Sequence, residues 1–177
     1  MWRKFWTPCT LNTVTNVIGF RRYCGGWRCL EDDSMTETES AGRLAEHSAL
    51  EMLSKDRASA SLGMELLEVA PGRARMRMRV RDDMLNGFQL CHGGLLCALA
   101  DTAFAVACNS WGPRAVGVAI SMEYLLPAHS GDCLLAEAEC QHQGGRQGLY
   151  DVRVSNQRGE TLVLLRGRSH RSGPKAE

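Results

Sequence analysis

The chain has 177 residues, of which 44% are hydrophobic, and carries 21 Lys and Arg against 20 Asp and Glu. This length fits one domain with a sizeable hydrophobic core, and the balanced charge lacks the electrostatic signature of a nucleic-acid or membrane-surface binder. No uncharged apolar run reaches the roughly 18 residues that a membrane span needs, because Asp101 interrupts the longest run, Leu95–Cys108. The eight cysteines form no CxxC pair, which favours reduced thiols in a cytoplasmic protein.

Residues 1–42 differ in composition from the rest of the chain. Residues 1–30 hold five basic residues and no acidic one, whereas residues 31–40 are acidic and polar. A basic, acid-free N-terminus is typical of a mitochondrial transit peptide. Because the segment has no amphipathic order, we favour the alternative that translation starts at Met35 and residues 1–34 are upstream sequence. We therefore expect a disordered N-terminal extension without a family counterpart, a folded domain and a short tail, at residues 1–42, 43–172 and 173–177.

Hydrophobic spacing predicts the first elements of the folded domain. Apolar residues at helical intervals indicate an amphipathic helix at about 41–56. Strands are expected at 64–70 and 73–80, separated by the turn signal Pro71-Gly72. In the second strand four arginines alternate with apolar residues, which is typical of a strand with one solvated face. A row of arginines also occurs on nucleic-acid-binding surfaces, but the acids nearby favour the solvated face.

The middle of the chain contains one long helix, expected at 93–109, which is apolar nearly all round. The run Trp111-Gly112-Pro113 ends it. Four strand-like runs separated by turn-rich segments follow, at 115–126, 133–143, 149–155 and 161–170. One buried helix followed by four meandering strands predicts an α+β fold with an antiparallel sheet.

The stretch Asn86–Asp101 carries the candidate chemistry. Gly93 and Gly94 lie at the expected helix start, where free backbone N–H groups and the helix dipole favour an anion. Asp101 is a carboxylate inside the apolar helix, and burial there is expected to raise its pKa, as suits a general base. An acid and an anion site together indicate acyl chemistry, in which a base or nucleophile acts at a carbonyl and donors hold the oxyanion.

Two runs in this region, Met84–Gly94 and Leu99–Ala105, closely resemble the PaaI acyl-CoA thioesterases of phenylacetic acid degradation. The signature of that family is a His-Gly-Gly motif whose first glycine, here Gly93, lies eight positions before an aspartate, here Asp101. The likeness covers about residues 43–172 and includes the C-terminal run Arg166–Arg171. It implies a hot-dog fold, in which an antiparallel sheet wraps a long central helix (about 93–109). It also implies hydrolysis of phenylacetyl-CoA, or of a hydroxylated or ring-modified derivative, to the free acid and CoA by a homodimer or homotetramer.

The site residues follow from the chemistry and the resemblance together. We assign Asp101 as general base or nucleophile and the Gly93 N–H as oxyanion donor. The resemblance also places Asn86 in the site, where it orients the attacking water or the aspartate, although it is equally a turn residue before Gly87. His92 polarises the carbonyl or only shapes the loop. Weaker candidates for substrate contact are Gln89, Gly94 and Thr102.

Cations are expected to bind the phosphates of CoA. The candidates are Arg146, Arg166, Arg168 and Arg171. Arginines in exposed strands are also commonly just solvated. Because the sequence has no P-loop, GxSxG, HExxH or zinc-like Cys/His spacing, we expect no metal and no protein-bound cofactor.

The spacing of the two principal groups makes assembly part of the prediction. Eight residues of helix separate Gly93 from Asp101 by ~12 Å, which is too far for both to contact one carbonyl. The two groups must therefore come from different subunits, and a homodimer is the expected minimal unit. The alternatives are another hot-dog enzyme (a medium-chain or aryl acyl-CoA thioesterase, or an enoyl-CoA hydratase) and a non-catalytic acyl-CoA-binding dimer.

Overall fold

The computed structural model describes residues 36–172, all of which belong to one compact unit, Thr36–Glu177. The elements in chain order are α1 (Glu37–Ser54), α2 (Arg57–Ser61), β1 (Glu65–Ala70), β2 (Arg73–Arg79), the 3-10 turn η1 (Asp82–Met84), α3 (Gly93–Asn109), β3 (Ala115–Tyr124), β4 (Cys133–Gly144), β5 (Gln147–Ser155) and β6 (Thr161–Arg171). The predicted start at Met35 and the predicted tail lie outside the described residues and stay predictions.

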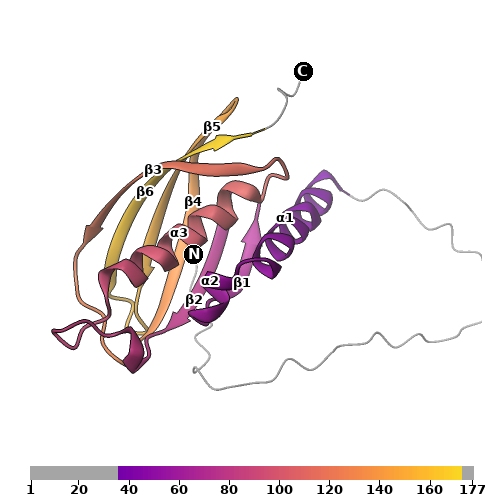
Figure 1. Ribbon diagram of the computed structural model, residues 1–177. Coiled ribbons are helices and arrows are strands. Elements are labelled where there is room, and N and C mark those ends of the chain that lie inside the picture. The colour runs from indigo at the N-terminus through magenta and orange to yellow at the C-terminus, as the bar shows by residue number, and fades with distance from the viewer. Residues whose placement is uncertain (1–35, 173–177) are drawn as a thin grey trace, which may run out of the picture. The chain divides into compact units, whose positions relative to one another are not determined.

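The fold is α+β, as the sequence predicts. Six strands form one antiparallel sheet in the order β1-β2-β4-β5-β6-β3, and the sheet curls around α3 (Figure 1). The helix contacts all six strands, while α1 packs beside β1. Because α3 is nearly all apolar, it is stable only when the sheet covers most of its surface. Its observed bounds agree with the predicted ones.

The first helix begins earlier than expected. Thr36 and Glu39 form a reciprocal capping box, in which each side chain accepts a hydrogen bond from the other residue's backbone N–H. Such a cap satisfies two of the N–H groups that a helix start leaves free. The expectation of disorder was therefore wrong for residues 37–42, which are helical. The short helix α2, capped by Asp56, was not predicted, since five residues are too few to show a period.

The expected meander is wrong for one strand. The strands β4, β5 and β6 follow one another as hairpins, but β3 pairs with β6 and takes the far edge of the sheet. The place beside β4 is occupied by β2, which pairs with it over Arg73–Arg79. Alternating hydrophobicity predicts that a strand exists but not which strand it joins. The consequence is that β3 has one unpaired edge, close to the residues of the candidate site.

The core lies between α3 and the sheet. Phe104 of α3 is fully buried, and its ring packs against Tyr150 with the ring centroids 5.5 Å apart. A Cβ at position 167 would lie 2.9–3.1 Å from three ring atoms of Phe104. The absence of a side chain at Gly167 therefore allows the helix to approach β6 closely.

The outer face of the sheet is solvated and charged. Arg73, Arg75 and Arg77 pair with acids on the neighbouring strands at 2.5–3.1 Å, which confirms the solvated-face interpretation of the arginine row. The cysteines within residues 36–172 are free thiols. In the same residues no group of three potential ligands is placed to hold a metal ion. No helix of this part of the chain is long and apolar enough to cross a membrane.

Candidate active site

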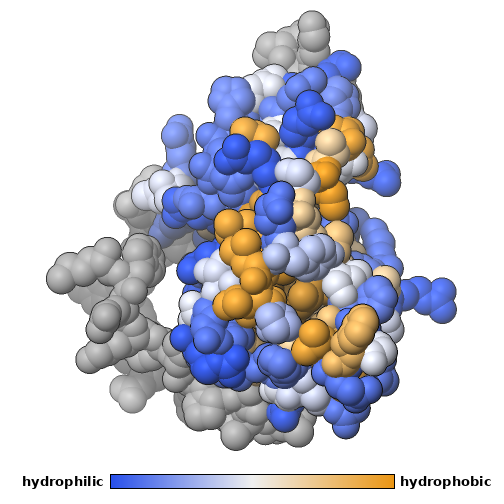
Figure 2. Space-filling model, turned by 90° about the vertical axis from the view of Figure 1, so that its left-hand side faces the viewer, coloured by the Kyte–Doolittle hydropathy of each residue, from blue (hydrophilic) through white to orange (hydrophobic). Residues whose placement is uncertain are grey.

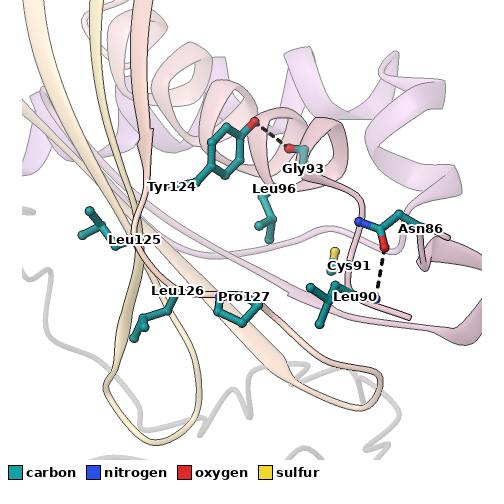
Figure 3. Close-up of a pocket in the computed structure, with 9 residues that line it drawn as sticks. All are labelled: Asn86, Leu90, Cys91, Gly93, Leu96, Tyr124, Leu125, Leu126 and Pro127. Atoms are coloured by element: carbon teal, nitrogen blue, oxygen red, sulfur yellow. Dashed lines mark hydrogen bonds between the residues drawn. The ribbon is translucent and has the colours of Figure 1, made fainter. Parts of the chain in front are cut away.

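The loop before α3 is organised by the side chain of Asn86. Its Oδ1 accepts hydrogen bonds from the backbone N–H of Phe88 (2.9 Å) and of Leu90 (3.3 Å), as in an Asx turn. Two backbone donors identify this atom as the oxygen, so the Nδ2 group carries the free N–H bonds. Figure 3 shows the nitrogen turned away from the bond to Leu90. Asn86 is therefore both a turn residue and a hydrogen-bond donor on the rim of a cavity.

The start of α3 leaves one backbone donor free. His92 is the N-cap, and its Nδ1 accepts the Gly94 N–H at 3.0 Å. The Leu95 N–H donates to the His92 carbonyl at 2.9 Å. Among the described residues the Gly93 N–H has no partner. Of the two glycines predicted to bind an anion, only Gly93 has a free N–H, because the N–H of Gly94 is already bonded to the imidazole of His92.

A cavity of about 350 Å³ opens at this helix start (Figure 3). Asn86 and Gly93 supply its polar groups, and most of the remaining wall is apolar, formed by Leu90, Cys91, Leu96, Leu125, Leu126 and Pro127. Tyr124 completes the lining, and its hydroxyl donates to the Gly93 carbonyl at 3.0 Å. Nothing in the sequence pattern marked Tyr124, because it reaches the site from a strand 31 residues further along the chain.

Asp101 lies in a second cavity of about 320 Å³, between α3 and β3. The lining contains the backbone and side chains of residues 117–120 together with Phe104 and Ala105. These apolar neighbours remove water from part of the carboxyl group, and this desolvation raises its pKa above the ordinary aspartate value. The sequence predicted a buried aspartate, but in the single chain the side chain is exposed on its open side. The strand β3 covers only one side of Asp101, which explains the difference.

The two cavities share no residue, and each is lined in part by β3 or the segment just after it. One chain therefore does not bring Gly93 and Asp101 to a single point. This agrees with the distance expected from their helical spacing.

Comparisons with known proteins place the chain in a family. Residues 88–163 match the Thioesterase superfamily. The acyl-coenzyme A thioesterase PaaI of Escherichia coli (strain K12) is 46% identical over 122 residues, which are 69% of this chain and 87% of that protein. The chain belongs to the PaaI-type acyl-CoA thioesterases. It is a thioester hydrolase with a hot-dog fold.

Solved structures support the assignment of this thioesterase. The structure of the E. coli PaaI protein matches with a TM-score of 0.74 and 43% identity, over 76% of this chain and 98% of that one. A Streptococcus mutans UA159 protein, smu.793, whose structure has acetyl CoA bound, matches with a TM-score of 0.61 and 27% identity, over 63% of this chain and 90% of that one.

Two other predicted site residues of the thioesterase, Gln89 and Thr102, line neither cavity. The Thr102 hydroxyl is 3.1 Å from the Ser59 hydroxyl of α2, so Thr102 faces α2, while Asp101 faces β3. Gln89 is exposed in the loop, with a positive φ of 59°. Their predicted contacts with substrate stay predictions that the geometry of the single chain does not support.

The predicted phosphate-binding arginines Arg146, Arg166 and Arg168 line neither cavity of the thioesterase. Arg166 forms a two-pronged ion pair with Asp151, at 2.6 and 2.7 Å, on the outer face of the sheet. Arg168 points to the same face, since exposed and buried residues alternate along β6. Arg146 lies in the turn between β4 and β5. Contact between these three residues and CoA stays a prediction.

Proposed function

We propose that this thioesterase hydrolyses arylacetyl-CoA thioesters, phenylacetyl-CoA or a hydroxylated or ring-modified derivative, to the free acid and CoA. The observation that carries the proposal is the free Gly93 N–H at the end of an apolar cavity. A thioester carbonyl bound there points its oxygen at the helix start, where the N–H and the helix dipole stabilise negative charge. The name of the E. coli relative supports an acyl-CoA substrate, and the apolar cavity wall supports an apolar acyl group.

The site is complete only in a homodimer. The strand β3 has a free edge, and Val116, Val118 and Ile120 on it are 46%, 59% and 44% exposed. A second copy paired along this edge about a two-fold axis runs antiparallel, so the Tyr124 end of each β3 meets the Ala115 end of the other. The Gly93 cavity of each copy then lies next to the Asp101 cavity of its partner.

The surface supports this assembly. Figure 2 shows the side of the molecule on which α3 begins and β3 ends, and hydrophobic groups gather in the middle of it within a hydrophilic border. Tyr124, Leu125 and Leu126 in this region are each about half exposed, at 54%, 51% and 46%. A contiguous apolar surface of this kind is typical of a protein–protein interface. The family resemblance extends the assembly to a homotetramer made of two such dimers.

In the proposed reaction, water adds to the thioester carbon and the carbon–sulfur bond breaks. The Gly93 N–H, with the Nδ2 group of Asn86, holds the oxyanion. The Asp101 carboxylate contributed by the partner subunit accepts the proton of the attacking water and then delivers it to the departing CoA sulfur. In the alternative route the carboxylate itself attacks and a mixed anhydride is hydrolysed. A single turnover in ¹⁸O-labelled water tests for the second route, because label enters Asp101 only when water attacks the Asp101 carbonyl of the anhydride.

The decisive experiment measures thiol release from a panel of acyl-CoA esters by wild-type protein and by Asp101→Asn. The amide is nearly the same size as the carboxylate but is not a base, so turnover is expected to fall at least ~100-fold while the dimer persists. Asp83→Asn is the matched control, because Asp83 is an exposed acid paired with Arg81. Undiminished turnover in Asp101→Asn rejects the assignment. Wild-type protein that binds the esters without releasing thiol is instead a non-catalytic acyl-CoA-binding dimer.

A further inference from the structure

Tyr124 contacts the first residue of α3 directly. Its hydroxyl donates to the Gly93 carbonyl at 3.0 Å. Two ring carbons and the hydroxyl oxygen each lie 3.3 Å from the position that a Cβ on Gly93 would occupy. The hydroxyl-bearing edge of the ring therefore packs against the helix start, at the residue that carries the free N–H. Tyr124 also lines the cavity at this helix start.

The hydrogen bond from Tyr124 continues through a peptide group to His92. The carbonyl of Gly93 and the N–H of Gly94 belong to the same peptide, and that N–H donates to His92 Nδ1 at 3.0 Å. Consecutive hydrogen bonds through one peptide group polarise one another, and both bonds of this chain are exposed in the single chain. Because Nδ1 accepts, a neutral His92 carries its proton on Nε2. Tyr124 thus acts on both the position of the Gly93 backbone and the tautomer of the imidazole.

We propose that Tyr124 is the positioning and acyl-selecting residue of the site. Its hydroxyl holds the Gly93–Gly94 peptide and so restrains the backbone of Gly93, whose own N–H, in the preceding peptide, points at the oxyanion. Its ring forms the wall against which the acyl group lies. A carbonyl bound to the Gly93 N–H places the next acyl carbons within contact of this ring. A flat aryl group then gains an aromatic contact that a linear chain does not. This inference rests on the proposed function.

The Tyr124→Phe substitution tests the positioning role, because it removes the hydroxyl and keeps the ring. We expect kcat to fall about three- to tenfold for every acyl-CoA, the scale of one uncharged hydrogen bond, with KM little changed. In ¹⁵N NMR spectra, His92 of the wild type is expected as the Nε2–H tautomer, and the variant is expected to shift toward a mixture of tautomers. An unchanged kcat together with an unchanged His92 spectrum overturns the positioning role.

The Tyr124→Leu substitution tests acyl selection, because it keeps an apolar side chain and removes the ring. We expect KM for phenylacetyl-CoA to rise about two- to tenfold more than KM for hexanoyl-CoA, the scale of one aromatic contact. Equal changes for both esters overturn the selecting role. Leu164→Ala is the control, since Leu164 is 45% exposed on β6 and lines neither cavity.

The outcomes separate this inference from the proposed function. If the wild-type protein hydrolyses the acyl-CoA panel and the Tyr124 variants have the same kcat and KM as the wild type, the inference about Tyr124 is wrong and the proposed function still holds. Wild-type protein that hydrolyses no ester overturns the proposed function and with it the selecting role of the ring. The NMR spectrum of His92 still reports on the hydrogen-bonded chain in that case, because it needs no substrate.

Discussion

At the scale of single residues, Asp101 and His92 owe their chemistry to different neighbours. The wall of β3 excludes water from one side of the Asp101 carboxyl, which raises its pKa. The Nδ1 atom of His92 is instead occupied as a helix cap, and the predicted role of its imidazole at the carbonyl stays a prediction. Sequence reasoning predicted both residues, but the wall of β3 beside Asp101 comes from residues 16–19 positions further along the chain, which only folding brings close.

The raised pKa of Asp101 predicts the acid side of the pH–rate profile. Only the carboxylate is a base or nucleophile, so kcat/KM is expected to fall as pH decreases through a pKa above the ordinary value of 3.8. A group whose pKa is raised by folding stabilises the folded state below its unfolded pKa, and this contribution is lost as pH rises through the folded pKa. The loss of activity in acid is therefore not unfolding caused by Asp101. Circular dichroism over the same pH range checks this, and a flat profile down to pH 3.8 contradicts the prediction.

At the scale of elements, the same substitution is expected to have opposite effects in a helix and at a packing contact. Gly167→Ala places a methyl group against the Phe104 ring and is expected to lower the free energy of unfolding by about 1–3 kcal/mol. Gly42→Ala in α1 meets nothing within 4 Å and is expected to raise it by about 0.5–1 kcal/mol, because alanine favours a helix. Urea denaturation measures both. Equal changes in the free energy of unfolding for the two substitutions would show that α3 and β6 are not closely packed at Gly167.

The helices and strands also show which structural features the local sequence pattern predicts and which it does not. The bounds of α3, β1 and β2 agree with the predicted ranges to within a residue or so, because helical and alternating periods are read from neighbouring residues. The position of β3 beside β6 was not predicted. Pairing of distant strands depends on the packing of both faces, which the period of one strand does not encode.

At the scale of the whole molecule, a shared site predicts complementation between two inactive variants. Gly93→Pro removes the oxyanion N–H while proline suits the first position of a helix, and Asp101→Asn removes the base. A hybrid dimer of the two has one site with both groups intact. Because half of the dimers in an equal mixture are hybrids and each has one intact site of two, about a quarter of wild-type turnover is expected after co-refolding.

Each variant refolded alone is the control and is expected to stay at its own low turnover. A mixture no more active than the two variants separately contradicts a shared site. Analytical ultracentrifugation of the same samples verifies that both variants still form dimers, so that loss of assembly is not mistaken for loss of complementation.

The sequence by itself determined most of the helix and strand pattern and the oxyanion and base candidates, and it predicted a site shared by two subunits. These depend on residue type and on spacing along one helix, which are local properties. Only the tertiary structure decided which donors at the helix start remain free, that Tyr124 holds the Gly93 carbonyl, and that β3 forms the edge beside both cavities. The Tyr124 contact and the position of β3 depend on residues far apart in the chain, and such contacts are selected by how the whole core packs. The occupied donor at the helix start depends on the side-chain conformation of His92, two residues from Gly94.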